Sequence, residues 1–122
     1  MKLTFIYLFL LASFISAQVD IVPTLKHIES GEIEEAQSDF RRLNSRYPKD
    51  ANVKFLDAVL TENGEEALNK YSTVYTKHPE FQFADAALYR VFSYYYSLGT
   101  YKKAEKHLTQ LKENYPNSEA NC

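Results

Sequence analysis

The chain has 122 residues, 45% of them hydrophobic and 25% charged, with a formal net charge of −2. This length suffices for one domain with its own core, and 3 Gly, 4 Pro and 1 Cys exclude a collagen-like, disordered or disulfide-stapled chain. A pI near 5.9 disfavours a nucleic-acid binder, because such a chain offers no basic field to phosphates.

The first seventeen residues have the layout of a secretory signal peptide. Met1-Lys2 supplies a positive start, Leu3 to Ile15 is an apolar run, and Ser16-Ala17 ends it with small residues. The run is shorter than the roughly 20 apolar residues of a stable membrane span. We therefore expect cleavage after Ala17, with an uncleaved anchor as the alternative.

Export follows from this signal, which fits a periplasmic and a secreted protein equally well. No cysteine stands near the cleavage site to accept a lipid, so no lipid anchor is expected. Cys122 is the single cysteine of the sequence and cannot form a bridge within one chain. An unpaired thiol and an intermolecular disulfide both remain open for it.

Three segments carry apolar residues at helical spacing and stop at a proline. The first and third share offsets 0, 3, 7, 10 and 14, and the second lacks the first position: Ile33, Ala36, Phe40, Leu43, Tyr47; Tyr101, Ala104, Leu108, Leu111, Tyr115; and Ala67, Tyr71, Val74, His78. Pro48, Pro79 and Pro116 follow these runs. Proline cannot continue a helix and disfavours helix in the residue before it, so each run predicts a helix that ends there.

A second kind of helix precedes the last two of these. Its apolar residues recur at offsets 0, 3 and 7, in Val53, Leu56, Leu60 and again in Leu88, Val91, Tyr95. The first unit has a shorter leading helix that starts at about Pro23. Gly99 is expected to end the helix before it in the left-handed conformation, and Thr100 to cap the next helix. Ser30-Gly31 and Asn63-Gly64 are expected to punctuate the other two hairpins in the same way.

The spacing of the repeats can be counted from their alanines. Ala36, Ala67 and Ala104 are separated by 31 and 37 residues, which average 34. A helix–turn–helix unit of this length is the period of the tetratricopeptide repeat. The third unit resembles that family at its signature places: Leu88, Val91, Tyr95, Gly99, Tyr101, Ala104, Leu108, Leu111 and Pro116.

This resemblance implies an all-α fold, a tetratricopeptide-like right-handed solenoid of three helix–turn–helix hairpins. The expected domain spans residues 18–122, with units at about 19–48, 49–79 and 80–116 and a short tail at 117–122. The Tyr-Pro-x-Ser-x-Ala ending is similar to bacterial cell-envelope members, such as the outer-membrane assembly lipoprotein and the Tol-associated coordinator. This resemblance implies the periplasm as the compartment, with secretion as the alternative. We carry over the architecture and not a specific role in outer-membrane assembly.

Tyrosines suggest a binding surface on the first helix of the third unit. Tyr89, Ser93 and Tyr96 share one stripe, whereas Tyr95 falls in phase with the core. In the resembled family this helix lines the concave surface, so the stripe is expected to contact a partner. The matching places in unit two are Lys54, Ala58 and Thr61. The alternative is that both tyrosines pack against a following repeat or cover the core.

No pattern points to catalysis, a cofactor or a metal. The sequence lacks a Gly-rich phosphate loop, Cys-x-x-Cys and His-Glu-x-x-His. His27, His78 and His107 lie on three segments without acidic or cysteine neighbours at ligand spacing, and His78 takes the place of a tyrosine in its sibling units. Glutamates cluster where helices begin, which suits the helix dipole: Glu32, Glu34, Glu35, Glu65 and Glu66. We expect no enzyme.

These observations favour an exported, non-catalytic protein–protein interaction scaffold of the cell envelope that presents a concave helical groove to a peptide or protein. We expect no nucleic-acid partner, and membrane contact by association alone. No capping element is visible after Pro116, so Leu108 and Leu111 are expected at an open end that a partner or a second copy covers. The alternative is a structural spacer or self-assembling segment of a longer envelope protein, with or without a cell-wall-binding module linked to it.

Overall fold

Six α-helices and one short 3-10 helix make up the fold of residues 18–121, the part of the chain that the computed structural model describes. They are α1 Val22–Glu29, α2 Ile33–Arg46, α3 Ala51–Leu60, α4 Gly64–Lys77, α5 Ala84–Ser97, α6 Tyr101–Asn114 and η1 Glu119–Asn121. No strand occurs within these residues, which confirms the predicted all-helical class. The expectations for residues 1–17 and Cys122 lie outside the described residues.

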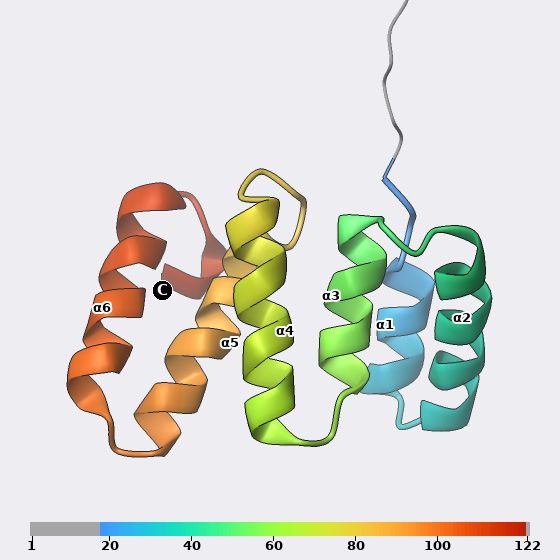
Figure 1. Ribbon diagram of the computed structural model, residues 1–122, viewed down its shortest axis with the longest axis horizontal. Helices are drawn as coiled ribbons and strands as arrows, with labels where there is room; N and C mark the ends of the chain where they lie inside the picture. The colour runs from blue at the N-terminus through green and yellow to red at the C-terminus, as the bar shows by residue number, and fades with distance from the viewer. Residues whose placement is uncertain (1–17, 122) are drawn as a thin grey trace, which may run out of the picture.

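The helices form three antiparallel hairpins that stand side by side along the longest axis (Figure 1). Hairpin α1–α2 lies at one end and α5–α6 at the other, with α3–α4 between them. The right-handed sense of the solenoid stays a prediction. Across residues 18–121, every helix is too short or too polar to span a membrane.

The second helix of each hairpin ends in the same backbone conformation. Tyr47, His78 and Tyr115 follow α2, α4 and α6 with φ/ψ of −132/58, −130/65 and −133/61 degrees. Each precedes a proline, whose ring excludes the helical conformation from the residue before it. The prolines therefore stop the helices as predicted, and His78 occupies the place of its sibling tyrosines.

The turns inside the hairpins differ from one another. Gly31 and Gly99 have φ of +78 and +76 degrees, the left-handed conformation that was expected of both. The expectation for Gly64 was wrong, because it is the first residue of α4 and not a turn glycine. Asn63 starts that helix, and its side-chain oxygen accepts a hydrogen bond from the Glu66 amide at 2.9 Å. Thr100 stands at the N-cap position of α6, but its side chain makes no capping hydrogen bond. The expected side-chain cap by Thr100 was therefore wrong.

The expected glutamates lie in first turns. Glu34 and Glu35 occupy the first turn of α2, and Glu65 and Glu66 that of α4. Their carboxylates meet the positive end of the helix dipole there. Glu32 is the N-cap residue of α2.

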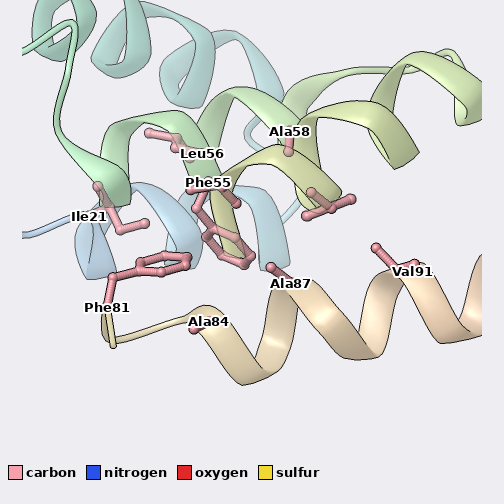
Figure 2. Packing of buried hydrophobic residues seen from close by; sticks show 10 residues of the cluster. Ile21, Phe55, Leu56, Ala58, Phe81, Ala84, Ala87 and Val91 are labelled. Atoms are coloured by element: carbon pink, nitrogen blue, oxygen red, sulfur yellow. The ribbon is translucent and has the colours of Figure 1, made fainter. Parts of the chain in front are cut away.

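Phe55 joins the second and third hairpins. Its ring is 5% exposed and lies 5.8 Å from Tyr71 of α4, 6.1 Å from Phe81 and 5.1 Å from Phe83, centroid to centroid. Figure 2 shows Phe55 between α3 and the segment that leads into α5, with Ile21 close to Phe81. Burying one such ring is worth about 2–3 kcal/mol, so this junction fixes where α5 begins.

Polar groups at the start of α3 tie the first hairpin to the second. Asp50 Oδ1 accepts hydrogen bonds from the Asn52 and Val53 amides at 2.9 and 3.2 Å and so caps α3. Asp50 Oδ2 accepts from the Val19 amide at 3.3 Å, and Asn52 Nδ2 donates to the Val19 carbonyl at 2.8 Å. The residues before α1 are therefore held against the next hairpin.

The repeat alanines lie where the two helices of each hairpin pack closely. Ala36 and Ala104 are buried, whereas Ala67 is half-buried beside the core. A small side chain at these places lets two helices approach closely.

Replacing Gly99 with alanine tests the left-handed turn. No heavy atom lies within 4 Å of an added Cβ, so Gly99→Ala costs only the conformational strain of positive φ. We expect the free energy of unfolding to fall by about 1 kcal/mol, measured by urea denaturation. Gly31→Ala is the matched variant, because Gly31 has a φ of +78 degrees and an added Cβ there also meets no heavy atom within 4 Å. It should lower stability by a similar amount, and an unchanged stability in both variants would contradict the assignment.

Candidate partner-binding surface

Helix α5 separates its aromatic residues onto two sides. Leu88 and Val91 are buried, and the half-buried Tyr95 packs against the same core, as its phase predicted. The Tyr95 ring stacks on His107 of α6 at 5.2 Å, and the Lys103 ammonium lies 5.4 Å from its centre. Tyr95 therefore serves the packing between α5 and α6.

The opposite side of α5 exposes a continuous line of rings. Tyr89 is 41% exposed and Tyr96 58% exposed, and Phe92 lies between them at 5.8 Å from each ring. Tyr101, at the start of α6, continues the line at 5.3 Å from Tyr96. We call these four residues the aromatic row. Sequence reasoning found its two α5 tyrosines and missed Phe92 and Tyr101, although the spacing 89, 92, 96 already places three rings on adjacent turns.

A cleft of about 760 Å³ opens beside the row, between α5 and the chain that follows α6. Tyr89, Arg90 and Ser93 line it from α5, and residues 117–120 line it from the other side. We call it the α5–tail cleft. Tyr89 and Ser93 of the expected stripe thus share one hollow, whereas Tyr96 lies outside its lining.

The tail is folded back against α5. Ser118 Oγ donates a hydrogen bond to Asp85 Oδ2 at 2.6 Å and accepts one from the Ala120 amide at 3.2 Å. Asn121 Nδ2 donates to the Tyr115 carbonyl at 2.6 Å. These bonds hold η1 beside the start of α5, so this end is partly covered where the sequence showed no capping element.

The expectation of an open apolar end at Leu108 and Leu111 needs correction. Leu111 is 0% exposed and Leu108 is half-buried, so the last helix already buries these side chains within its own hairpin. Leu111 offers nothing to a second copy. The exposed apolar residues of this end are instead Leu98, Tyr96 and Tyr101.

The three expected positions on α3 do not form one surface. Lys54 is exposed, Thr61 is half-buried, and Ala58 is 1% exposed within the core cluster. Ala58 therefore cannot contact a partner, which corrects that assignment. The sequence phase placed it correctly relative to Ser93 but did not reveal that Ala58 lies within the buried core cluster.

Lys54 instead lines a separate cleft of about 230 Å³ between α3 and α4. Lys70 crosses it and donates hydrogen bonds to Asp57 Oδ1 at 3.1 Å and Thr61 Oγ1 at 2.9 Å, with Glu66 Oε1 at 3.3 Å. Burial alone would lower the pKa of Lys70, but the bonds to the two carboxylates outweigh it and raise the pKa above 10.5. The cleft is thus neutralised by its own ion pairs.

Three tyrosine phenols at the junction of the second and third hairpins have raised pKa values. Burial raises the pKa of Tyr71 above 10.0, and Arg90 opposes this. Burial raises the pKa of Tyr75 as well. Tyr115, whose hydroxyl donates to the Pro79 carbonyl at 2.7 Å, has its pKa raised by burial and by the negative charge of Asp85. All three favour the neutral phenol.

One histidine differs from the expectation that none has acidic neighbours. His27 has acidic neighbours, because its Nδ1 lies 2.7 Å from Glu32 Oε2 and its Nε2 lies 3.8 Å from Asp39 Oδ2. The two carboxylates stand at opposite nitrogens of the ring and do not converge on one point. In the described part of the chain, no group of three His, Cys, Asp or Glu residues is placed to hold a metal ion.

Comparison with known proteins points to one repeat family. A family model described as tetratricopeptide repeat matches residues 85–118, which span α5, α6 and the start of the tail. A search of curated proteins found no match for the chain. The matched segment is the hairpin that carries the aromatic row.

Alkaline titration tests the buried phenols and Lys70 together. Each pKa is higher in the folded chain than in the unfolded one, so the stability that these groups confer is fully present below about pH 10. It is lost as the pH rises through the folded-state values. We expect the urea midpoint to decrease as the pH rises above about 10, and to decrease less steeply in Tyr71→Phe. A midpoint that stays constant over this range would contradict the shifts.

Proposed function

We propose that this chain is an exported, non-catalytic protein-interaction scaffold of the cell envelope, and that its contact surface is the exposed side of α5. Tetratricopeptide repeats generally mediate protein–protein interaction, and the family model covers the hairpin in question. The concave groove, the right-handed solenoid and the kinship with envelope assembly families belong to this proposal. A peptide or protein is the partner, and the chain meets membranes only through it.

The observation that carries the proposal is the exposure of the aromatic row beside a cleft. Tyrosine offers a large, rigid contact area and a hydroxyl at little rotamer entropy, so it is enriched among residues that dominate binding energy. Tyr89 and Tyr96 remain 41% and 58% exposed although the same helix buries Tyr95 in part. The rings lie in one line, and the centroids of neighbouring rings are 5.3–5.8 Å apart. They form an apolar strip of the kind that is typical of interaction sites.

The export part of the proposal rests on residues 1–17. Their positive start, apolar run and small-residue end are the layout of a cleaved signal. We propose the periplasm as the compartment, without a lipid anchor, and secretion as the alternative.

Processing after Ala17 is tested on the protein expressed from the full sequence with its natural export. We expect intact-mass and N-terminal sequencing of the exported protein to give Gln18 as the first residue. Retention of Met1 in a membrane fraction would instead support the uncleaved anchor. An intact, soluble cytoplasmic product would contradict export.

The contact surface is tested by partner capture. We expect the variant with Tyr89→Ala and Tyr96→Ala to capture at least about tenfold less partner from envelope extract than the unchanged mature chain, with equal helicity by circular dichroism. Tyr47→Ala is the matched control, because that tyrosine is 44% exposed but lies on the first hairpin. It should leave capture unchanged.

Two outcomes would count against the proposal. Equal capture by the double variant and the unchanged chain would remove the α5 surface from the interaction. Capture of the bait alone, with sedimentation that shows concentration-dependent assembly, would favour the second candidate, a self-assembling spacer. The exposure of Leu98 and Tyr101 at 61% each is the observation that favours that candidate.

A further inference from the structure

We propose that Tyr96 and Tyr101 form a site of oxidative coupling, at which hydrogen peroxide and a haem peroxidase join the two phenol rings into one dityrosine cross-link. The site lies where α5 turns into α6 (Figure 1). This modification goes beyond the proposed function, because it needs neither a partner nor export. Its basis is the supply of oxidisable side chains, the distance between the two phenols, and the fixed turn that joins them.

Tyrosine is the residue type most open to one-electron oxidation in residues 18–121. The sequence contains no tryptophan, and its single methionine and single cysteine are Met1 and Cys122. Tryptophan, methionine and cysteine are the side chains that compete with tyrosine for an oxidant. None of them occurs in residues 18–121, so an oxidant that meets this part of the chain takes its electrons from phenols.

Tyr96 and Tyr101 present two exposed phenols side by side. Their ring centroids lie 5.3 Å apart with an angle of 65 degrees between the ring planes, so the edge of one ring meets the other ring. The two residues are 58% and 61% exposed, so an oxidant reaches both and both side chains are free to rotate. Tyr94 and Tyr95 are a second pair at 5.7 Å, but both are half-buried. The exposed pair is therefore the one where two radicals form and meet.

Other exposed tyrosines have ring neighbours that cannot couple in this way. The ring next to Tyr89 is Phe92, at 5.8 Å, and phenylalanine lacks the hydroxyl from which a phenoxyl radical forms. The neighbour of the Tyr47 ring is the Arg46 guanidinium, 6.0 Å from its centre. Exposure alone thus does not make a coupling site, and these two tyrosines serve as comparisons.

The backbone between the two tyrosines is held in a tight turn. The amides of Leu98, Gly99 and Thr100 donate hydrogen bonds to carbonyls of α5 at 3.2, 3.0 and 3.0 Å. Gly99 has a φ of +76 degrees and so reverses the chain after α5. The turn keeps the end of α5 beside the start of α6. A cross-link therefore requires rotation of two side chains and no movement of the helices.

Coupling removes two hydrogen atoms from the chain. Each phenol loses one electron and one proton and becomes a phenoxyl radical, whose unpaired electron is shared with the ring carbons next to the C–O carbon. The two radicals combine at these carbons and form one carbon–carbon bond. The hydrogens of those carbons move to the oxygens as protons, which restores both hydroxyl groups. The two electrons and two protons that leave the chain reduce one hydrogen peroxide to two water molecules.

The test treats the purified, folded protein with hydrogen peroxide and a haem peroxidase, followed by trypsin digestion and mass spectrometry. Trypsin cleaves after Arg90 and Lys102, so residues 91–102 form one peptide that carries both tyrosines. We expect this peptide to lose the mass of two hydrogens and to gain dityrosine fluorescence. The yield per chain should not change with protein concentration, because both rings belong to one chain.

Four conservative variants locate the new bond. Tyr96→Phe and Tyr101→Phe each keep the ring and remove one hydroxyl, and each should abolish the loss of two hydrogens from this peptide. Tyr94→Phe changes a half-buried tyrosine of the same peptide and should leave the loss unchanged. Tyr89→Phe changes an exposed tyrosine outside the peptide and should leave it unchanged as well. Circular dichroism should show equal helicity in all four.

Three results would overturn the assignment. A loss of two hydrogens that persists in both Tyr96→Phe and Tyr101→Phe would place the bond on another pair. Cross-links that join two chains, and that increase with protein concentration, would show that exposed tyrosines meet at random. An unchanged peptide, under conditions that couple free N-acetyltyrosine, would show that the pair does not react. Partner capture without oxidant, with the alanine variants of Tyr89 and Tyr96, decides the proposed function separately.

Discussion

A single helical hairpin cannot bury all of its apolar surface, and this constraint governs the whole molecule. Two antiparallel helices cover each other on one side only, so every hairpin needs a neighbour. Phe55 shows how the neighbour is supplied, because its ring lies between α3, α4 and the segment that enters α5. The prolines after Tyr47, His78 and Tyr115 serve the same end, since they stop each second helix where the next hairpin must begin.

Periodicity predicted the helices well because it reports the inward side of a helix directly. The helix ends at proline and the left-handed Gly99 were predicted from the backbone preferences of proline and glycine, which are also local. Periodicity failed where residues far away in the sequence determine whether a side chain is buried. Ala58 shares the phase of Ser93, yet one is buried and the other borders a cleft, and only the stacking of hairpins distinguishes them. The prediction for Gly64 was wrong because Asn63 caps α4 by accepting a hydrogen bond from the Glu66 amide, and Asn-x-x-Glu is a sequence signal for the start of a helix.

The same constraint is why we propose the third hairpin as the one that contacts a partner. The second hairpin has neighbours on both sides, and its polar cleft is closed by the ion pairs of Lys70. The third hairpin has α4 on one side and, on the other, a single turn of the tail held by Ser118 and Asp85. Exposed aromatic surface gathers on this hairpin, where contact with water is costly, and under the proposed function a protein partner covers it.

Site-specific photocross-linking of the mature chain in the cell envelope tests this account most directly. A photoreactive residue replaces Tyr96 in one variant and Tyr47 in another, so that two comparably exposed tyrosine positions on different hairpins are compared. The account predicts one defined protein adduct from position 96 that disappears when Tyr89→Ala is added, and none from position 47. Equal labelling from both positions, or adducts of the chain with itself alone, would contradict it.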